Sequence, residues 1–241
     1  VIANASVNKM TVISNGKEYR AIQVGTVMTH PDYRNQGLAA ELMNKIIETY
    51  EKEYDFIYLF ANKTVLDFYP KFGFEKVKES RFSMKAYHLE KVTDNTSSLR
   101  KLDINNQTDF QLMKEFAIER VPVSSILGVK NSEHLLMFYF IIVFKNSIYY
   151  DEEENVIIIF EVEDDKLHVF DIISKARVEA DRVLSRIVSA DIDIIYFYFI
   201  PDLYSEDVDA VYMEESNDVL FVRPLLLNDT GHLAFPLTSH S

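Results

Sequence analysis

One stretch of the sequence decides the fold: VGTVMTHPDYRNQGLAAELMNKII, which runs from Val24 to Ile47. Its apolar first part ends at Pro31, and a short polar turn follows. After Gly37 the apolar residues recur at the spacing of one helix face, at Leu38, Leu42, Met43, Ile46 and Ile47. The stretch therefore predicts a buried strand that leads through a glycine-containing turn into an amphipathic helix.

The residues on both sides of this stretch predict a mixed α/β unit. Asn15-Gly16 lies between two apolar, alternating segments, which is a strong signal for a hairpin. Asn62 can cap a helix that follows it. The expected elements are strands over 4–14, 19–29 and 56–61, a helix over 63–69, and a closing hairpin of 74–77 and 82–88.

The second half of the chain repeats this order of hairpin, helix and strand. The polar run 93–98 separates the halves and predicts a linker. We therefore expect two copies of one fold with diverged sequences, a domain over 1–92 and a second domain over 99–241. The elements expected in the second copy are strands over 99–102, 156–163, 167–174, 192–200, 219–224 and 232–236, and helices over 109–120 and 178–188.

The composition excludes several classes of protein. Hydrophobic residues make up 48% of the 241 residues, which is ample for a packed core. Cysteine is absent, so disulfides, cysteine-bound zinc and a thiol nucleophile are excluded. The longest apolar run, 135–144, is too short to cross a bilayer. Together with the absence of a signal peptide, these features predict a cytoplasmic location and no membrane partner.

The net charge of −13 is distributed unevenly. Residues 1–90 hold 12 Lys and Arg against 11 Asp and Glu, whereas residues 91–241 hold 13 against 27. An acidic chain does not suit nucleic acid, whose phosphates require basic surface. The acidic second half fits either a solvated surface or a cationic substrate.

The turn before the helix has the features of an anion site. A helix start presents backbone N–H groups without intrahelical partners at the positive end of the helix dipole, and such a start binds phosphate. Gly37 allows close approach and Arg34 adds positive charge; the alternative is an ordinary connection with one permissive glycine. The six glycines form neither G-x-G-x-x-G nor the P-loop pattern.

These residues resemble a known family. Residues 27–39, VMTHPDYRNQGLA, resemble motif A of the GCN5-related N-acetyltransferases (GNAT), with its pattern [RQ]-x-x-G-x-[GA]. Residues 59–62 and 68–74, LFAN and FYPKFGF, resemble motif B. The two-copy layout is similar to the enhanced-intracellular-survival acetyltransferases. The resemblance implies two tandem GNAT-like folds, of which the first is N-terminally shortened because it begins at the hairpin.

The resemblance also implies acetyl-CoA as the co-substrate, without a metal. The pyrophosphate would bind the backbone amides of Arg34, Asn35, Gln36, Gly37, Leu38 and Ala39. The pantetheine arm would pair with Thr26, Val27 and Met28, as a peptide strand pairs with a sheet edge. Asn62 would contact the cofactor near the thioester, cap its helix, or do both. Gly25 would mark a bulge that separates this strand from its neighbour, or would accommodate close packing.

Tyr69 is the predicted catalytic residue, because it stands four residues before Gly73-Phe74 as the family's acid does. A phenol with a pKa of about 10 can protonate a departing thiolate. The alternative is a packing tyrosine, and Pro70 is expected to end the helix beside it. The general base is open: Glu18, acidic residues of the second copy and the carboxylate of Ser241 are candidates, and His30 is expected to be structural.

The second copy is expected to bind no cofactor. Its corresponding turn, 173–180, lacks the glycine, and Glu179 and Asp181 would repel a pyrophosphate. The resemblance thus implies transfer of acetyl from acetyl-CoA to a primary amine, on a small molecule or a peptide, by direct attack in a ternary complex. The alternatives are a non-catalytic acyl-CoA-binding or regulatory module, and an interaction domain that does not bind coenzyme A.

Overall fold

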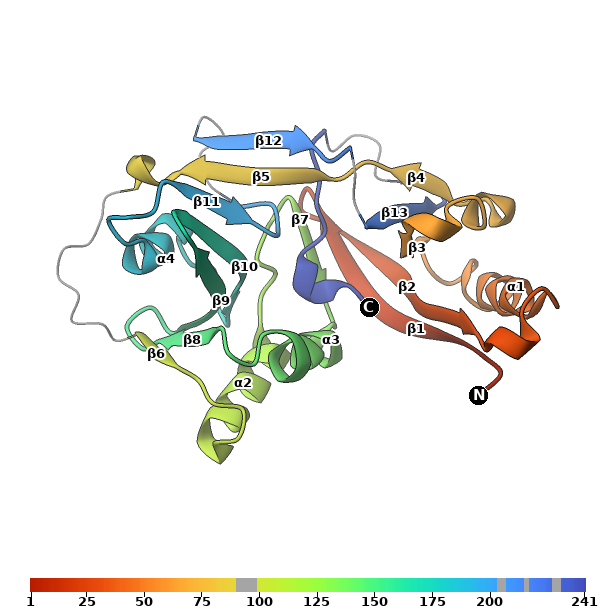
Figure 1. The fold of residues 1–241 in the computed structure, drawn as a ribbon, viewed down its shortest axis with the longest axis horizontal. Coiled ribbons are helices and arrows are strands. Elements are labelled where there is room, and N and C mark those ends of the chain that lie inside the picture. The colour runs from red at the N-terminus through yellow and green to blue at the C-terminus, as the bar shows by residue number, and fades with distance from the viewer. Residues whose placement is uncertain (90–98, 203–206, 215–216, 227–230) are drawn as a thin grey trace.

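The structure is a computed structural model that describes residues 1–89, 99–202, 207–214, 217–226 and 231–241. It contains two mixed sheets, shown side by side in Figure 1. The strands of the first sheet are β1 (Ala3–Ser14), β2 (Lys17–Thr29), β3 (Phe56–Asn62), β4 (Glu75–Val77), β7 (Leu127–Lys130) and β13 (Asp218–Arg223). Those of the second are β5 (Ser80–Lys85), β6 (Leu99–Lys101), β8 (Ile148–Asp151), β9 (Val156–Glu163), β10 (Lys166–Ser174), β11 (Ile194–Phe197) and β12 (Val208–Tyr212).

The predicted hairpin and helix of the first half are confirmed. Asn15 and Gly16 have φ angles of 48° and 76°, so both occupy the left-handed region that a tight two-residue hairpin turn requires. The helix α1 (Leu38–Tyr50) buries Met43, Ile46 and Ile47. These side chains pack on Ile22 and Val24 of β2 and on Ile57, Leu59 and Ala61 of β3. Alternate residues of β3 therefore face α1, as the period of a strand dictates.

The second sheet repeats the arrangement of the first. In both, an antiparallel hairpin is followed by a helix and by a strand parallel to the hairpin's second strand: β1, β2, α1, β3 and then β9, β10, α4 (Ala180–Ile187), β11. The strand orders are β4-β13-β3-β2-β1-β7 and β12-β5-β11-β10-β9-β8-β6. The second sheet also packs against α2 (Gln107–Glu119) and α3 (Glu133–Phe138), and one π-helical segment, Tyr139–Val143, continues α3.

The two sheets exchange one strand each. β5 follows β4 after only Lys78 and Glu79, yet β4 pairs with β13 of the first sheet and β5 pairs with β11 and β12 of the second. In return, β13 pairs with β3. The predicted hairpin of 74–77 and 82–88 is therefore wrong, because strand propensity identifies the strands and tertiary packing selects their partners.

The exchanged strands are deeply buried. Phe82 and Met84 of β5 are 5% and 2% exposed, and Leu220 and Val222 of β13 are 1% and 0% exposed. Burying a side chain of this size contributes about 1.5–3 kcal/mol, which stabilises the exchange. All four belong to one core cluster that also contains side chains of β1, β3, β9, β10 and α4, so the sheets share a core.

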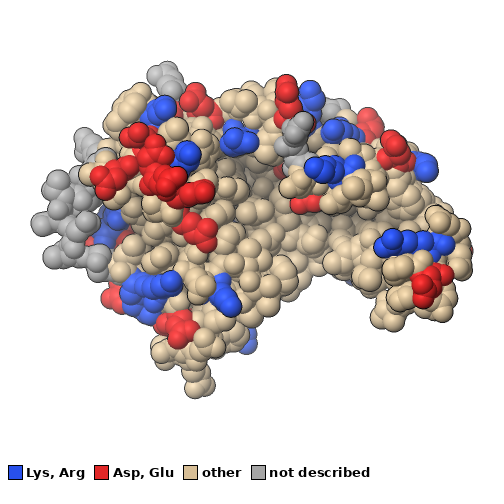
Figure 2. Space-filling model, viewed as in Figure 1, with Lys and Arg blue, Asp and Glu red and all other residues tan. Residues whose placement is uncertain are grey.

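The predicted domain boundaries, 1–92 and 99–241, stay a prediction, although each sheet draws strands from both ranges. The predicted linker 93–98 lies outside the described residues. The predicted strand 232–236 is wrong: this segment runs between the sheets and leads into a 3₁₀ turn, Leu237–Ser239. On the face shown in Figure 2, acidic side chains gather over the second sheet, in line with the uneven charge of the sequence, and uncharged residues cover the middle.

Candidate functional site

The turn between β2 and α1 presents backbone amides that find no acceptor among the described residues. Asn35 and Gly37 have φ angles of 62° and 83°, and no described side chain caps the start of α1. A Cβ built on Gly37 would have no atom of the described residues within 4 Å, so among them the space in front of the turn is open. Left-handed residues beside a helix start direct successive N–H groups toward one point, which is the geometry of an anion site.

Two neighbouring side chains shape this turn. The amide of Arg34 donates to Pro31 O at 3.2 Å and its Nε donates to Thr29 O at 3.4 Å, so Arg34 is held against the end of β2. Its amide is therefore engaged, which leaves the amides of residues 35–39 as the candidates to bind an anion. His30 Nδ1 accepts from Asp32 N at 3.3 Å and caps the turn, which agrees with the structural role expected for it.

β2 and β3 separate directly beyond Val24 and Leu59. Their parallel pairing joins residues 21–24 to residues 56–59 and then ends, although β2 continues to Thr29 and β3 to Asn62. We call this opening the β2–β3 divergence. It coincides with a bulge, because Ala5 of β1 lies opposite both Thr26 and Val27 of β2. The predicted link between Gly25 and a bulge is therefore observed.

The predicted pantetheine residues lie along the divergent part of β2. Thr26 has a φ of 46°, and its Oγ1 donates to Ser6 Oγ at 2.8 Å. Val27 packs against the core cluster under α1, whereas Met28 is 54% exposed. Because this part of β2 is not paired with β3, its edge on that side is available to an extended ligand.

The segment 233–241 reaches the start of the divergence. A Cβ on Gly25 would lie 2.2 Å from Ser241 Oγ and 3.0 Å from Ser6 Oγ, so close packing also requires glycine here. Ser239 O accepts from Gln23 Nε2 at 2.7 Å, and the ring of His240 stacks on Phe60 at 3.6 Å between centroids. Ser241, one of the candidate bases, is thus held beside the point where the strands part.

Glu18 does not reach this site. Its carboxylate pairs with Lys130 Nζ at 2.6 Å near the hairpin turn. Gly25 is seven residues further along the strand, about 23 Å at the rise of an extended chain. Glu18 is therefore excluded as a base that acts at the divergence.

Asn62 and Tyr69 lie on the other side of the divergence, beyond β3. Asn62 Oδ1 accepts from Thr64 N at 3.0 Å, which confirms its capping role. The predicted helix 63–69 is replaced by two 3₁₀ turns, Lys63–Val65 and Tyr69–Phe72. Pro70 stands in the first turn of the second, where no N–H donor is needed, so it begins this turn and does not end a helix.

Tyr69 is 6% exposed and packs against Phe68, Phe74 and Phe221 in the cluster under α1. Burial raises the pKa of Tyr69, so its hydroxyl keeps its proton at neutral pH. No hydrogen bond of the Tyr69 hydroxyl is found among the described residues. Tyr69 is thus a protonated phenol whose hydroxyl is uncommitted within the described chain.

The equivalent divergence in the second sheet is filled by the chain itself. The β10–β11 pairing ends at Val169 and Phe197. Beyond it, Leu237 N donates to Tyr198 O at 2.9 Å and Thr238 Oγ1 donates to the buried carboxylate of Asp171. Asp171 also forms a bidentate pair with Arg120, at 2.8 and 3.0 Å. This occupancy is a second physical reason, besides the missing glycine, to expect no cofactor there.

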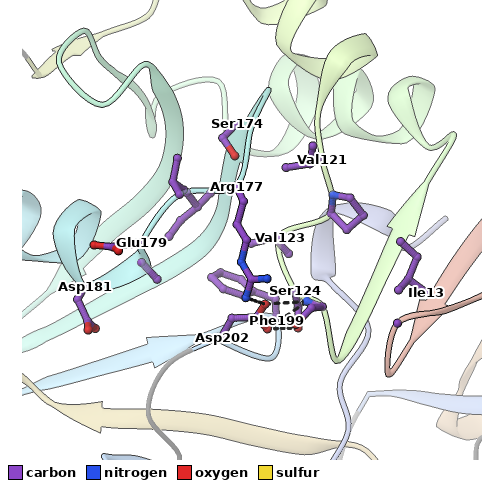
Figure 3. A pocket seen from close by; sticks show the side chains of 16 residues that line it. Ile13, Val121, Val123, Ser124, Ser174, Arg177, Glu179, Asp181, Phe199 and Asp202 are labelled. Atoms are coloured by element: carbon purple, nitrogen blue, oxygen red, sulfur yellow. Dashed lines mark hydrogen bonds and ion pairs between the residues drawn. The ribbon is translucent and has the colours of Figure 1, made fainter.

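A cavity of about 740 Å³ lies beside the start of α4, and Figure 3 shows its lining. Glu179 and Asp181 lie on its α4 side and Val121 on the opposite side. Asp202 accepts from Ser124 Oγ and Ser125 N, both at 2.8 Å. Arg177 pairs with Asp202 at 3.6 Å, so Glu179 and Asp181 leave the lining acidic on balance; that the second copy binds no cofactor stays a prediction.

The helices and the metal-ligating side chains also bear on the function. Within the ranges described above, none of the helices has the length and apolar character needed to cross a membrane. The same part of the chain shows no group of three or more metal-ligating side chains.

The comparisons with known proteins agree with this geometry. Residues 1–77 match the family model of the acetyltransferase (GNAT) domain. The predicted resemblance to the GNAT acetyltransferases is confirmed. The match contains the β2–α1 turn and Tyr69. No curated protein matches the chain in sequence.

Solved GNAT structures share the fold of most of the chain. A GCN5-related N-acetyltransferase from Kribbella flavida matches 92% of the chain at 18% identity, with a TM-score of 0.55. A probable N-acyltransferase from Enterococcus faecalis V583 matches 92% at 14% identity and a TM-score of 0.56. Eis1 from Mycobacterium abscessus matches 91% at 13% identity and a TM-score of 0.54. The chain spans 57%, 59% and 61% of these proteins, about three fifths of their length.

Proposed function

We propose that this GNAT protein transfers an acetyl group from acetyl-CoA to a primary amine. One observation carries the proposal: β2 parts from β3 immediately before an uncapped helix start whose glycine faces open space. A long ligand with a pyrophosphate at one end and an amide-bearing arm at the other fits this combination. The acceptor would be a small molecule or a peptide.

Acetyl-CoA would supply an activated acyl group as a thioester. The amides of residues 35–39 would bind its pyrophosphate, and Thr26, Val27 and Met28 would bind the pantetheine arm along the free edge of β2. Asn62 caps the turn that follows β3 and would contact the arm from that side.

Tyr69 would supply the proton that the departing sulfur needs. Its hydroxyl is protonated at neutral pH, and its ring is fixed by three aromatic neighbours. The chain contains no cysteine that could carry the acetyl group, so the amine would attack directly in a ternary complex.

Release of free thiol from acetyl-CoA in the presence of a panel of primary amines tests the proposal. We expect amine-dependent release that requires Tyr69. Coenzyme A binding without transfer to any amine would instead favour the acyl-CoA-binding module, and the absence of binding would favour an interaction domain.

A further inference from the structure

A second cavity, of about 500 Å³, lies between the two sheets. Phe60, the first β3 residue beyond the last β2–β3 pair, lines it, and so does His240, the neighbour of Ser241. The cavity therefore begins where the β2–β3 divergence begins. Aromatic rings form much of its wall, and its volume suits a small organic molecule. We call it the inter-sheet cavity.

Glu79 is the buried charge of this cavity. It lies in the two-residue connection that carries the chain from β4 in the first sheet to β5 in the second, and it is 9% exposed. Its Oε1 accepts from Phe235 N at 3.0 Å. Within the described residues, no lysine, arginine or histidine forms an ion pair with Glu79. A buried carboxylate without a cation is costly unless a partner arrives with the ligand.

The surroundings favour the neutral form of Glu79 until such a partner arrives. Burial raises its pKa to about 7, and nearby Asp218 adds to the rise, while the hydrogen bond from Phe235 opposes it. A carboxyl group with a pKa near 7 can both accept and release a proton at neutral pH.

His240 provides a second acceptor in the inter-sheet cavity. Its Nε2 is buried and has no hydrogen-bond partner within the described residues. Burial lowers the pKa of His240 to about 4, so the ring is neutral at pH 7. A hydrogen bond with the backbone of Phe235 engages the other ring nitrogen of His240. Nε2 is therefore the unprotonated nitrogen, which can accept a hydrogen bond. The Glu79 carboxyl group and the unpartnered Nε2 of His240 in one cavity fit a ligand that brings several N–H donors.

We propose that the inter-sheet cavity binds the acceptor amine as its ammonium ion, and that Glu79 holds this ammonium and takes up the proton it must lose. This inference rests on the proposed function, because it assigns the acceptor side of the same site. An alkylammonium group has three N–H donors and one positive charge, which match the carboxylate and the imidazole nitrogen.

The proposed acetyl transfer conserves its protons. The ammonium gives one proton to the Glu79 carboxylate and becomes an amine with a free electron pair. The nitrogen then forms a bond to the acetyl carbon as the bond from this carbon to sulfur breaks, and the sulfur keeps the electron pair. The sulfur takes one proton, and the nitrogen loses its second. Glu79 returns its proton to water, so the net products are the amide, the thiol and one proton.

Other charged and titratable groups also line the inter-sheet cavity. They are Arg81 on β5, Glu163 on β9, Lys166 and His168 on β10, Tyr196 on β11, Tyr198 beyond it, Asp218 on β13 and His240. Glu163 is the matched control, because its side chain is 78% exposed at the rim of the same cavity.

Glu79→Gln tests the inference. Glutamine keeps the size of the side chain and an oxygen that accepts from Phe235 N, but it cannot take up a proton. In the wild type, kcat/KM should rise with pH through an inflection near 7. In Glu79→Gln this inflection should vanish and kcat should fall about 10²–10⁴-fold, whereas Glu163→Gln should keep it. An unchanged inflection in Glu79→Gln, with transfer intact, would overturn the inference and leave the proposed function standing.

Calorimetry provides a readout that does not depend on activity. The probe is 2-phenylethylamine, whose ring suits the aromatic wall, titrated at pH 7 in buffers of different ionisation enthalpy. Because Glu79 is about half protonated at pH 7, binding of the ammonium should release roughly half a proton in the wild type and none in Glu79→Gln. Such binding without acetylation of any amine would refute the proposed function and support the cavity assignment. Equal proton release by both proteins, or no binding to the wild type, would overturn the inference.

Discussion

Gly37 offers a clean test of the pyrophosphate site, because asparagine and aspartate both tolerate its left-handed φ of 83° and differ mainly in charge. A Cβ at this position meets no described atom within 4 Å, and both variants share the backbone strain of the left-handed φ, so the comparison between them isolates the charge. We expect Gly37→Asn to weaken coenzyme A binding modestly through bulk. Gly37→Asp should weaken it further, because a carboxylate would then stand beside the pyrophosphate.

The size of the charge effect follows from Coulomb's law. Two unit charges about 5 Å apart interact by about 0.8 kcal/mol in water and about 3 kcal/mol at the effective dielectric of a protein surface. Gly37→Asp should therefore bind coenzyme A about 4- to 200-fold more weakly than Gly37→Asn. Calorimetry at low salt measures both dissociation constants, and added salt should narrow the difference. Equal affinities for the two variants, both folded by thermal unfolding, would refute a phosphate site at this turn.

Three further predictions concern the remaining residues of the site. Tyr69→Phe should lower kcat about 10²–10⁴-fold while the dissociation constant of coenzyme A changes little; an unchanged kcat would show that Tyr69 only packs. Gly25→Ala should lower kcat, because the new Cβ would lie 2.2 Å from Ser241 Oγ and would displace Ser241. Removal of Ser241 from the Gly25→Ala variant should lower kcat no further, and additive losses of kcat would contradict the contact. Because Glu79 has a folded pKa of about 7 against an ordinary 4.5, its contribution to stability is lost as pH rises through 7. The Tm of Glu79→Gln relative to the wild type should accordingly increase between pH 5 and pH 8, and a pH-independent difference would refute the raised pKa.

Local sequence signals predicted the strands β1, β2 and β3 and the helix α1. Asn15-Gly16 has the residue types that a two-residue hairpin turn demands, and the apolar spacing after Gly37 predicted the helix that is observed as α1. The turn between β2 and α1 was also predictable, because its chemistry lies in adjacent residues. For the same reason the family resemblance could be recognised from residues 24–74 alone.

Strand partners could not be predicted from such local signals. β4 and β5 are separated by two residues and have the pattern of a hairpin, yet they belong to different sheets. The choice depends on β13, which lies far along the chain and supplies the better partner for both β3 and β4. Long-range pairing of this kind is decided by packing of the whole core and not by the propensity of a segment.

The acceptor side of the site was invisible for the same reason. Nothing in the residues around Glu79 indicates burial; its environment is created by Phe235, more than 150 residues later. The segment 233–241 was predicted partly as a strand, although Ser241 was named as a candidate base. Its true position depends on contacts with both sheets, through Gln23 on one side and Tyr198 on the other.

Titration of the chain with coenzyme A by calorimetry tests the central claim most directly, because the claim places one acyl carrier at the divergence of the first sheet and none at that of the second. We predict a stoichiometry of about one coenzyme A per chain, with affinity weakened in Gly37→Asp. A stoichiometry near two, or binding that Gly37→Asp leaves intact, would contradict the assignment of the site, and the absence of any binding would contradict the proposed acetyl transfer itself.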